Sequence, residues 1–251
     1  MTVKKIQQEV NPKHVLILGC GRSGTSIFGE LFEHLSCYNY YSEPAFSDLL
    51  DFDFATPTAI KVPKESKGFP PTKGLSFPLK TSQKLIPEVV VFWQVRHPLD
   101  TICSLKVGIS RNWGHHPQPP DWQNWLDKPL IKQCAHHWNY LNSIGYPQVK
   151  NMATITKFEN MISHPKNFAI QIGQKVGIDF NKNESAINTW AKRVQNSNNK
   201  DFIEAKTSRA YSTTDHKVKV GRWKENMSLA EKEMVVPMIQ ATALQFGYSF
   251  D

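Results

Sequence analysis

Short apolar runs and helical apolar spacing alternate along the chain. Val15 to Leu18 form an apolar run that ends in glycines, and apolar residues then recur at helical spacing between Ser26 and Leu35. Two further strands are predicted over Thr58 to Val62 and Glu88 to Val95, and the second has the continuous apolar character of a strand buried on both faces. Buried strands that lead into helices predict a parallel sheet.

The same alternation continues to the C-terminus, and its order is that of an open α/β fold. The pattern predicts a helix that begins near Pro98, a helix around Leu130 to Ile144, a strand over Met152 to Thr156, a helix around Pro165 to Val176, and a last helix that begins at Ser228 with the spacing of a capping box. Internal repeats and low-complexity tracts are absent from the sequence.

Two long segments lack a periodic pattern. Residues 112–127 are crowded with Trp, His and Pro, and residues 196–220 are polar. Loops of this length in a compact domain are usually lids, binding segments or disordered stretches. From the length of the chain we expect a single domain over residues 1–251, with a flexible N-terminus at about residues 1–13.

The composition is ordinary for a soluble protein but has an excess of positive charge. Hydrophobic residues make up 40% of the sequence, and no apolar run reaches the ~18 residues of a membrane span. The N-terminal stretch has a charged start and no apolar segment after it, so we expect no secretory signal and a cytoplasmic protein. The formal charge of +8 favours anionic partners without choosing among nucleotide, nucleic acid, acidic glycan and membrane.

The sequence gives no indication of a metal site. Its four cysteines are widely separated and form no C-x-x-C pair, which argues against both a zinc site and a disulfide framework. A cluster of carboxylates for magnesium cannot be assigned either. We therefore expect reduced thiols and no bound metal.

The stretch HVLILGCGRSGTS, from His14 to Ser26, has the spacing of a phosphate-binding loop. Read from Gly19 it gives G-x-x-x-x-G-T-S, with Thr25 where a nucleoside-triphosphate enzyme places its lysine. A strand that ends in glycines and restarts as a helix directs backbone N–H groups and the positive end of the helix dipole at one spot. The residues expected to hold an anion there are Gly21, Arg22, Ser23, Gly24, Thr25 and Ser26, with Arg22 supplying the positive charge.

A second anion site is predicted in VRHPLDTICSL, from Val95 to Leu105. Arg96 follows a buried strand at its carboxyl end, where ligands of open α/β sheets bind, and Ser104 lies eight residues later, about two helical turns into the next helix. An arginine at a strand end is more often part of a surface ion pair, so the assignment depends on the first loop. With that loop, both side chains are candidates for a second phosphate.

The two motifs resemble those of the sulfotransferases that use 3′-phosphoadenosine 5′-phosphosulfate (PAPS). In that family a loop of the form K/R-S-G-T-S/T holds the 5′-phosphosulfate, and an arginine with a proline two residues later and a serine eight residues later holds the 3′-phosphate. Two later stretches are also similar to family patterns. KFENMISHP, from Lys157 to Pro165, is similar to an aromatic-Glu-x-Leu motif that precedes a helix. VGRWKENMS is similar to a basic segment that closes over the nucleotide.

This resemblance implies a fold, a cofactor and further binding residues. The fold would be a P-loop NTPase-like three-layer α/β fold with a central, mostly parallel sheet flanked by helices. The cofactor would be PAPS, with the desulfonated nucleotide PAP as product and no metal, because PAPS has no β,γ-phosphate pair for magnesium. Residues of about 196–251 would cover the cofactor, with Gly221, Arg222 and Trp223 next to the nucleotide.

Sulfonate transfer also needs a base for the acceptor and cations for the leaving phosphate. The resemblance places Arg22 where many relatives have a catalytic lysine, and Lys61, in AIKVPK, at the lysine of the family's K-T-H or K-T-P segment. The small-molecule branch has its histidine base just after that lysine, where this chain has Val62. We therefore select Glu43, in YYSEPAF, because carbohydrate-type and several bacterial relatives carry a glutamate after the first helix. The alternatives are a structural role of Glu43 in the turn before Pro44 and a rival base among His115, His116, His136 and His137.

The acceptor is not readable from the sequence beyond a class. Glu43 favours an alcohol on a carbohydrate or lipid, or a small metabolite with a hydroxyl or amine, as the acceptor. Trp113, Trp122 and Trp125 either bind a ring of the acceptor or belong to the hydrophobic core. Two other functions remain: a P-loop kinase of a nucleoside or small metabolite, and a non-catalytic nucleotide-binding or nucleic-acid-binding module. The kinase lacks its lysine, and no long basic helix supports nucleic acid, so we expect no nucleic acid as partner. The oligomeric state stays open.

Overall fold

One parallel sheet forms the centre of the molecule. The computed structural model describes residues 12–196 and 220–250. Within them five strands lie in the order β2-β3-β1-β4-β5, and every neighbouring pair is parallel, which confirms the predicted α/β fold with a mostly parallel sheet. The strands are β1 (Val15–Gly19), β2 (Asn39–Ser42), β3 (Thr58–Lys61), β4 (Val90–Val95) and β5 (Ala153–Lys157).

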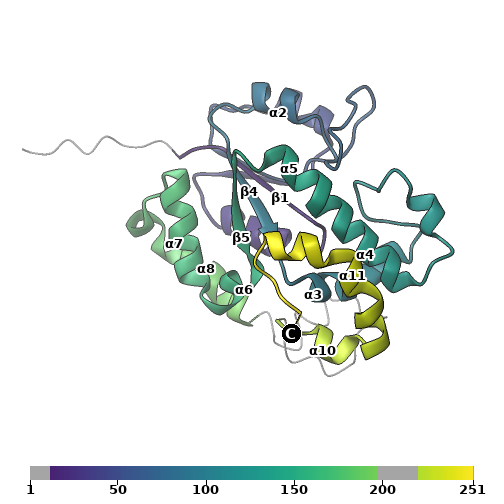
Figure 1. Cartoon of the computed structure of the whole chain (residues 1–251). Helices are drawn as coiled ribbons and strands as arrows, with labels where there is room; N and C mark the ends of the chain where they lie inside the picture. Colours follow the sequence, from purple (N-terminus) through teal and green to yellow (C-terminus); the bar gives the residue numbers. More distant parts are fainter. Residues whose placement is uncertain (1–11, 197–219, 251) are drawn as a thin grey trace, which may run out of the picture.

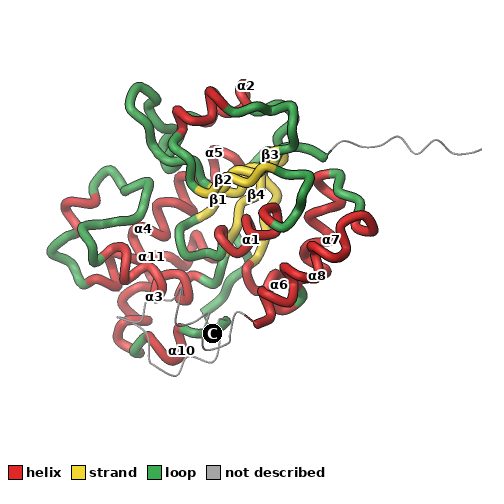
Figure 2. Tube along the Cα trace, turned by 180° about the vertical axis from the view of Figure 1, so that it is seen from behind, coloured by secondary structure: helices red, strands yellow, loops and turns green. Residues whose placement is uncertain are grey.

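Helices cover both faces of the sheet and produce three layers (Figure 1). Helices α1, α6, α7 and α8 contribute to the apolar cluster on one face, and α3, α4 and α11 to the cluster on the other. Figure 2, seen from behind, places α1 in front of the strands. The helices are α1 (Thr25–Glu33), α2 (Leu79–Leu85), α3 (Pro98–Ile109), α4 (Leu130–Tyr140), α5 (Tyr146–Val149), α6 (Phe158–Ser163), α7 (Pro165–Val176), α8 (Phe180–Asn196), α10 (Trp223–Asn226) and α11 (Leu229–Gln245), with 3-10 turns η1 (Phe46–Asp51) and η2 (Trp122–Trp125) and a π turn η3 (Leu141–Gly145).

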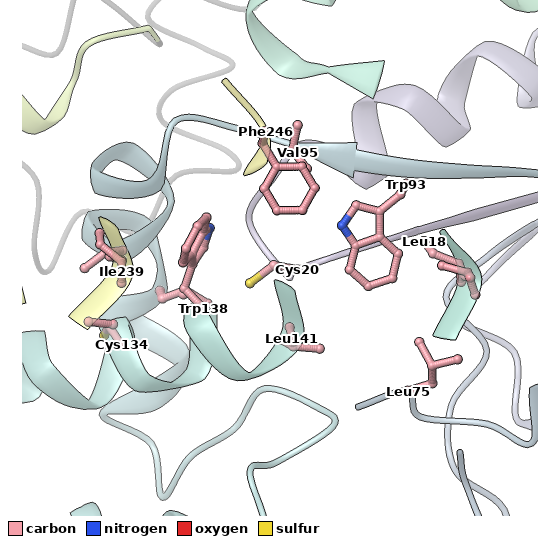
Figure 3. Packing of buried hydrophobic residues seen from close by; sticks show 14 of the residues in the cluster. Leu18, Cys20, Leu75, Trp93, Val95, Cys134, Trp138, Leu141, Ile239 and Phe246 are labelled. Atoms are coloured by element: carbon pink, nitrogen blue, oxygen red, sulfur yellow. The ribbon is translucent and has the colours of Figure 1, made fainter. Parts of the chain in front are cut away.

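The central strands β1 and β4 are almost wholly apolar because both of their faces are buried. In β1, Leu16 belongs to the cluster under α3, α4 and α11, whereas Val15 and Ile17 belong to the cluster under α1, α7 and α8. Figure 3 shows part of the first cluster, in which Trp93 of β4 and Trp138 of α4 appear on either side of Cys20, the residue that follows β1. Buried aromatic rings of this size contribute strongly to the hydrophobic free energy of folding.

Several elements were not expected from the sequence pattern. Strand β2 has four residues at the edge of the sheet, half-buried or exposed, so it carries no apolar run. Helix α8 has its apolar residues Ile187, Trp190 and Val194 on one buried stripe of an otherwise polar segment. The sequence prediction wrongly treated residues 112–127 as loop throughout, because Trp122–Trp125 form the 3-10 turn η2.

The C-terminal helix begins as predicted. The Ser228 hydroxyl accepts a hydrogen bond from the N–H of Glu231 at 3.2 Å, and the Ser228 N–H donates to the Glu231 carboxylate at 2.9 Å, which completes the capping box. The expected flexible N-terminus falls largely on residues 1–11, and the expected long loop of residues 196–220 largely on residues 197–219, so both lie outside the described residues.

The strand order brings the candidate residues to one edge of the sheet. Because all five strands are parallel, their carboxyl ends lie on the same side. The loop after β1 therefore meets Glu43 after β2, Lys61 at the end of β3, and Arg96 after β4. Residues that are far apart in the sequence thus line a single edge.

Candidate active site

The loop between β1 and α1 requires glycine at two positions. Gly19 has a φ of 145°, and a Cβ there would overlap the carbonyl oxygen of Gln94 in the neighbouring strand. Gly24, the N-cap of α1, has a φ of 90°, and a Cβ there would overlap the ring of Phe158. The first N–H groups of a helix have no partner within the helix, so this tight turn leaves them directed at the loop.

The hydroxyls of the loop occupy different places. Ser23 and Thr25 are buried, whereas Ser26 is exposed and accepts a hydrogen bond from Lys61 Nζ at 3.0 Å. The Lys61 side chain is only 4% exposed. A lysine from β3 therefore reaches the loop that lacks a lysine of its own.

The two predicted phosphate motifs meet in space. Arg22 Nε donates a hydrogen bond to Ser104 Oγ at 3.0 Å, and Arg96 Nη1 donates to the carbonyl oxygen of Arg22 at 3.4 Å. Ser104 lies on α3, and its side chain is buried with that of Arg96. The loop and helix α3, which carry the two predicted anion sites, therefore lie directly next to each other.

The KFENM stretch supports Arg96 from the other side. The Arg96 guanidinium carbon lies 4.5 Å from the centroid of the Phe158 ring. The next residue, Glu159, accepts hydrogen bonds from the His97 N–H at 2.7 Å and from the Tyr248 hydroxyl at 2.8 Å. The C-terminal residues are thereby attached next to Arg96.

The late basic segment also reaches this place. Asp100 of α3 accepts hydrogen bonds from the N–H groups of Gly221 and Trp223, each at 2.8 Å. The Trp223 ring lies parallel to the His97 ring, with 5.9 Å between their centroids. Arg222, between the two bonded residues, is 7% exposed. The structure therefore brings Gly221, Arg222 and Trp223 to the start of α3, close to Arg96.

The positive charges of Arg22, Arg96 and Arg222 repel one another at this edge of the sheet. Burial lowers the pKa of Arg22, and the charge of Arg96 lowers it further. Burial likewise lowers the pKa of Arg222 to about 10, with contributions from the charges of Arg96 and Arg22. Guanidinium groups stay protonated in proteins at neutral pH, so all three side chains are cations. A dense group of partly buried positive charges is stabilised when an anion such as phosphate binds among them.

Glu43 lies between two lysines. Its carboxylate contacts Lys61 Nζ at 2.7 Å through one oxygen and Lys64 Nζ at 3.1 Å through the other. Burial raises the pKa of Glu43, but hydrogen bonds and charge from both lysines outweigh it, so the pKa is lowered overall. Glu43, Lys61 and Ser26 therefore form a connected row that ends at the loop.

Three strained backbone positions lie at the same edge. Arg22, Glu43 and Val62 have positive φ values of 70°, 55° and 38°, and the other non-glycine residues with positive φ in the described part of the chain are Glu88, Asn112 and Trp113. This conformation is unfavourable for side chains with a Cβ, above all for β-branched Val62, and such residues are found preferentially at functional sites.

His115, which the sequence analysis named only as one of four rival bases, lies beside the loop. Its Nδ1 lies 3.2 Å from the position that a Cβ on Gly21 would take, and its ring covers Gly108 of α3. Burial lowers its pKa to about 4, an effect that Arg22 increases and Glu43 opposes. His115 is therefore neutral at pH 7. No local pattern could have selected it, because its loop is placed against Gly21 by tertiary packing.

We expect His115 to make the protein sensitive to acid. Its pKa of about 4 in the folded state lies below the ordinary 6.5, so between these pH values the unfolded chain binds more protons. Stability is then fully present above about pH 6.5 and lost as the pH falls towards 4. In His115→Gln, the free energy of unfolding should depend less on pH in this window, by up to ~1.4 kcal/mol per pH unit. Urea unfolding from pH 4.5 to 7 measures this.

The matched control for that experiment is His116→Gln, which changes the neighbouring exposed histidine. A slope that falls equally in both variants, or in neither, would contradict the placement of His115 against Arg22.

Two of the other predicted rivals, His136 and His137, pack against aromatic residues of the same loop. His137 is fully buried, and its Nδ1 accepts a hydrogen bond from Trp113 Nε1 at 3.2 Å, which makes Trp113 a core residue. His136 pairs with Asp121 at 2.8 Å and stacks on Trp125 with 4.0 Å between ring centroids. Trp122 and Trp125 are only partly buried.

The described residues contain no group of three or more His, Cys, Asp and Glu side chains arranged to hold a metal ion. Nor does any helix in residues 12–196 and 220–250 have the length and apolar character needed to cross a membrane. The cysteines in this part of the chain are all free thiols.

Comparison with known proteins identifies the class of fold. No protein-family model matches the sequence, and no curated protein matches it significantly. Solved structures are similar over nearly the whole chain. The sulfotransferase domain of the Synechococcus PCC 7002 olefin synthase has a TM-score of 0.61 and 13% identity, with 100% of both chains covered.

Two further similar structures contain PAP. Mouse sulfotransferase SULT7A1 complexed with PAP has a TM-score of 0.57 and 15% identity over 94% of this chain and 85% of its own. Retinol dehydratase, in complex with androsterone and the inactive cofactor PAP, has a TM-score of 0.51 and 12% identity over 96% of this chain and 83% of its own. At these identities the likeness establishes the fold: this chain has the fold of the sulfotransferases.

Proposed function

We propose that this protein is a PAPS-dependent sulfotransferase formed by a single domain. The observation that carries the proposal is the meeting of Arg22, Arg96 and Arg222 around a glycine loop at the carboxyl edge of the sheet. Two separate anion-binding places, one at the loop and one at α3, suit a nucleotide with both a 5′-phosphosulfate and a 3′-phosphate. The PAP found in similar structures of the same fold supports this choice.

The binding roles divide between the two places. We assign the 5′-phosphosulfate to the N–H groups and hydroxyls of the loop, and the 3′-phosphate to Arg96, Ser104 and Arg222. The loop residues are Gly21, Arg22, Ser23, Gly24, Thr25 and Ser26. Trp223 and Gly221 would line the nucleotide from the late basic segment, because Asp100 holds that segment against α3.

The same residues supply the chemistry of transfer. The acceptor oxygen forms a bond to sulfur while the bond from sulfur to the bridging oxygen breaks, and that oxygen leaves with the electron pair on PAP. Glu43 accepts the proton of the acceptor, and Lys61 and Arg22 stabilise the charge on the leaving phosphate. The connected row of Ser26, Lys61 and Glu43 links the base directly to the cofactor loop.

Ionisation favours this role for Glu43. Its lowered pKa keeps it a carboxylate at neutral pH, which is the form that accepts a proton. The two lysines have an opposing effect as well. They make Glu43 a weaker base, because a proton on its carboxylate would break the ion pairs with Lys61 and Lys64. Glu43 is 43% exposed, so an acceptor reaches it from solvent. We propose a hydroxyl or amine of a carbohydrate, a lipid or a small metabolite as the acceptor.

Nucleotide binding without a metal tests the proposal. We expect PAP to bind in calorimetric titrations with EDTA present. In our proposal the phosphates are neutralised by guanidinium and N–H groups, so no metal ion is needed. The comparison ligands are ATP with magnesium, which a kinase would prefer, and an oligonucleotide, which a nucleic-acid-binding module would prefer. Binding that requires magnesium, or a preference for ATP or oligonucleotide over PAP, would refute the sulfotransferase assignment.

A further inference from the structure

Asp100 connects two parts of the chain that are far apart in sequence. Its carboxylate is fully buried near the start of α3. One oxygen accepts the N–H of Gly221 and the other accepts the N–H of Trp223, both at 2.8 Å. The residue between these two donors is Arg222. A single carboxylate thus fixes the backbone on both sides of one arginine.

Two further contacts continue this attachment along α3. Cys103 Sγ lies 3.8 Å from the carbonyl oxygen of Asn226, and Lys106 Nζ contacts the Glu231 carboxylate at 2.8 Å. Asp100, Cys103 and Lys106 are spaced three residues apart, so they fall on neighbouring turns of the helix. Their partners advance along the chain in the same order. The late basic segment therefore lies along α3 from Gly221 to the first turn of α11.

The same helix carries the proposed 3′-phosphate site. Ser104 is on α3, and Arg96 lies two residues before the first residue of this helix. Arg96 Nη2 is 3.8 Å from the Asp100 carboxylate. Arg222 belongs to the segment that Asp100 attaches, and its charge interacts with that of Arg96. Like charges repel, so without a bound nucleotide Arg222 and Arg96 would tend to move apart. Holding Arg222 beside Arg96 in that state needs an attachment that does not depend on the nucleotide.

We propose that Asp100 is a positioning residue, which holds Arg222 beside Arg96 and so presets the 3′-phosphate site before the nucleotide binds. This inference rests on the proposed function, because it assigns the neighbouring arginines to a phosphate of PAP. A carboxylate suits the role since it accepts two N–H groups at once and carries the charge that offsets Arg96. A preset site binds more tightly because less ordering accompanies binding.

A double-mutant cycle tests whether Asp100 acts through Arg222. The variants are Asp100→Asn, Arg222→Ala and the combination, each titrated with PAP and with adenosine 5′-phosphosulfate, which lacks the 3′-phosphate. We expect Asp100→Asn to weaken PAP binding about tenfold, because the Asn side chain retains one acceptor oxygen and loses the charge. In the Arg222→Ala background the same change should weaken PAP binding by less than about twofold. Adenosine 5′-phosphosulfate should bind within about threefold throughout.

The outcomes separate this inference from the proposed function. Additive effects of the two changes, equal losses for both nucleotides, or tighter PAP binding by Asp100→Asn would overturn the positioning role. A wild-type protein that binds neither nucleotide would overturn the proposed function itself. Asp127→Asn is the matched control, since it makes the same change at an exposed carboxylate that pairs with the neighbouring Lys128, and it should leave PAP affinity unchanged.

A second variant keeps the test decisive if Asp100→Asn fails to fold. Asp100→Glu retains the charge beside Arg96, but its longer side chain cannot place both oxygens 2.8 Å from the same two N–H groups. We expect a similar loss of PAP affinity, again absent in the Arg222→Ala background. Full PAP affinity in Asp100→Glu would contradict the proposal.

Discussion

Replacing Glu43 with glutamine should lower turnover at saturating PAPS by at least tenfold and leave PAP affinity within about threefold, roughly 0.65 kcal/mol. Glutamine keeps the shape and an oxygen that can accept the hydrogen bond from Lys61, but it cannot take a proton from the acceptor. A positioned base contributes about 10² to 10⁴ in rate, so the loss should be large. Our proposal assigns the PAP phosphates to the arginines and the β1–α1 loop, so binding should not depend on Glu43.

The measurement combines turnover with PAP titration once an acceptor has been found by mass spectrometry of products that gain a sulfonate. Glu65→Gln is the matched control, because it neutralises an exposed carboxylate next to Lys64. Near-normal turnover in Glu43→Gln would assign the base to a histidine, and His115 would be replaced next because it lies against Gly21. Loss of PAP binding together with turnover would make Glu43 a structural residue.

Replacing Arg96 with alanine should weaken PAP binding by roughly 10- to 150-fold, the equivalent of about 1.5 to 3 kcal/mol for a lost charge-assisted hydrogen bond. The Arg96 side chain is 8% exposed, so water cannot readily take its place beside the phosphate. Adenosine 5′-phosphosulfate should be nearly indifferent to the change. Calorimetric titration of both nucleotides gives the comparison.

Two further variants show which part of the Arg96 side chain matters. Arg96→Met keeps apolar contact with the Phe158 ring while removing the charge, so it should lose PAP affinity as Arg96→Ala does. Arg193→Ala removes an arginine from the ion pair with Glu30 on α1 and should leave PAP binding unchanged. Equal weakening of PAP and adenosine 5′-phosphosulfate by Arg96→Ala would contradict the assignment to the 3′-phosphate.

The sequence by itself determined the elements that depend on local pattern. Buried strands such as β4 are recognisable in the sequence as continuous apolar runs. Gly19 and Gly24 mark a tight turn, because a side chain at either position would overlap its neighbours. The capping box at Ser228 is likewise a local signal, since all its hydrogen bonds fall within four residues. The parallel sheet and the glycine turn between β1 and α1 could therefore be predicted from the sequence.

Short or solvent-facing elements could not be predicted in the same way. Strand β2 is an edge strand whose residues are partly exposed, so it is defined by pairing with β3 and not by its own composition. Helix α8 is mostly polar, and its narrow apolar stripe becomes distinctive only when it packs under α1 and α7.

The composition of the candidate site was decided by tertiary structure. Asp100 meets Gly221 and Trp223 across more than 120 positions of sequence, with separations of 121 and 123. His115 reaches Gly21 because its loop follows α3, and Lys61 reaches Ser26 because β3 pairs with β1. Such contacts depend on strand order and helix packing, which no local periodicity records. The sequence could therefore indicate which residues are candidates for binding anions, whereas only the fold decided which carboxylate and which histidine stand beside them.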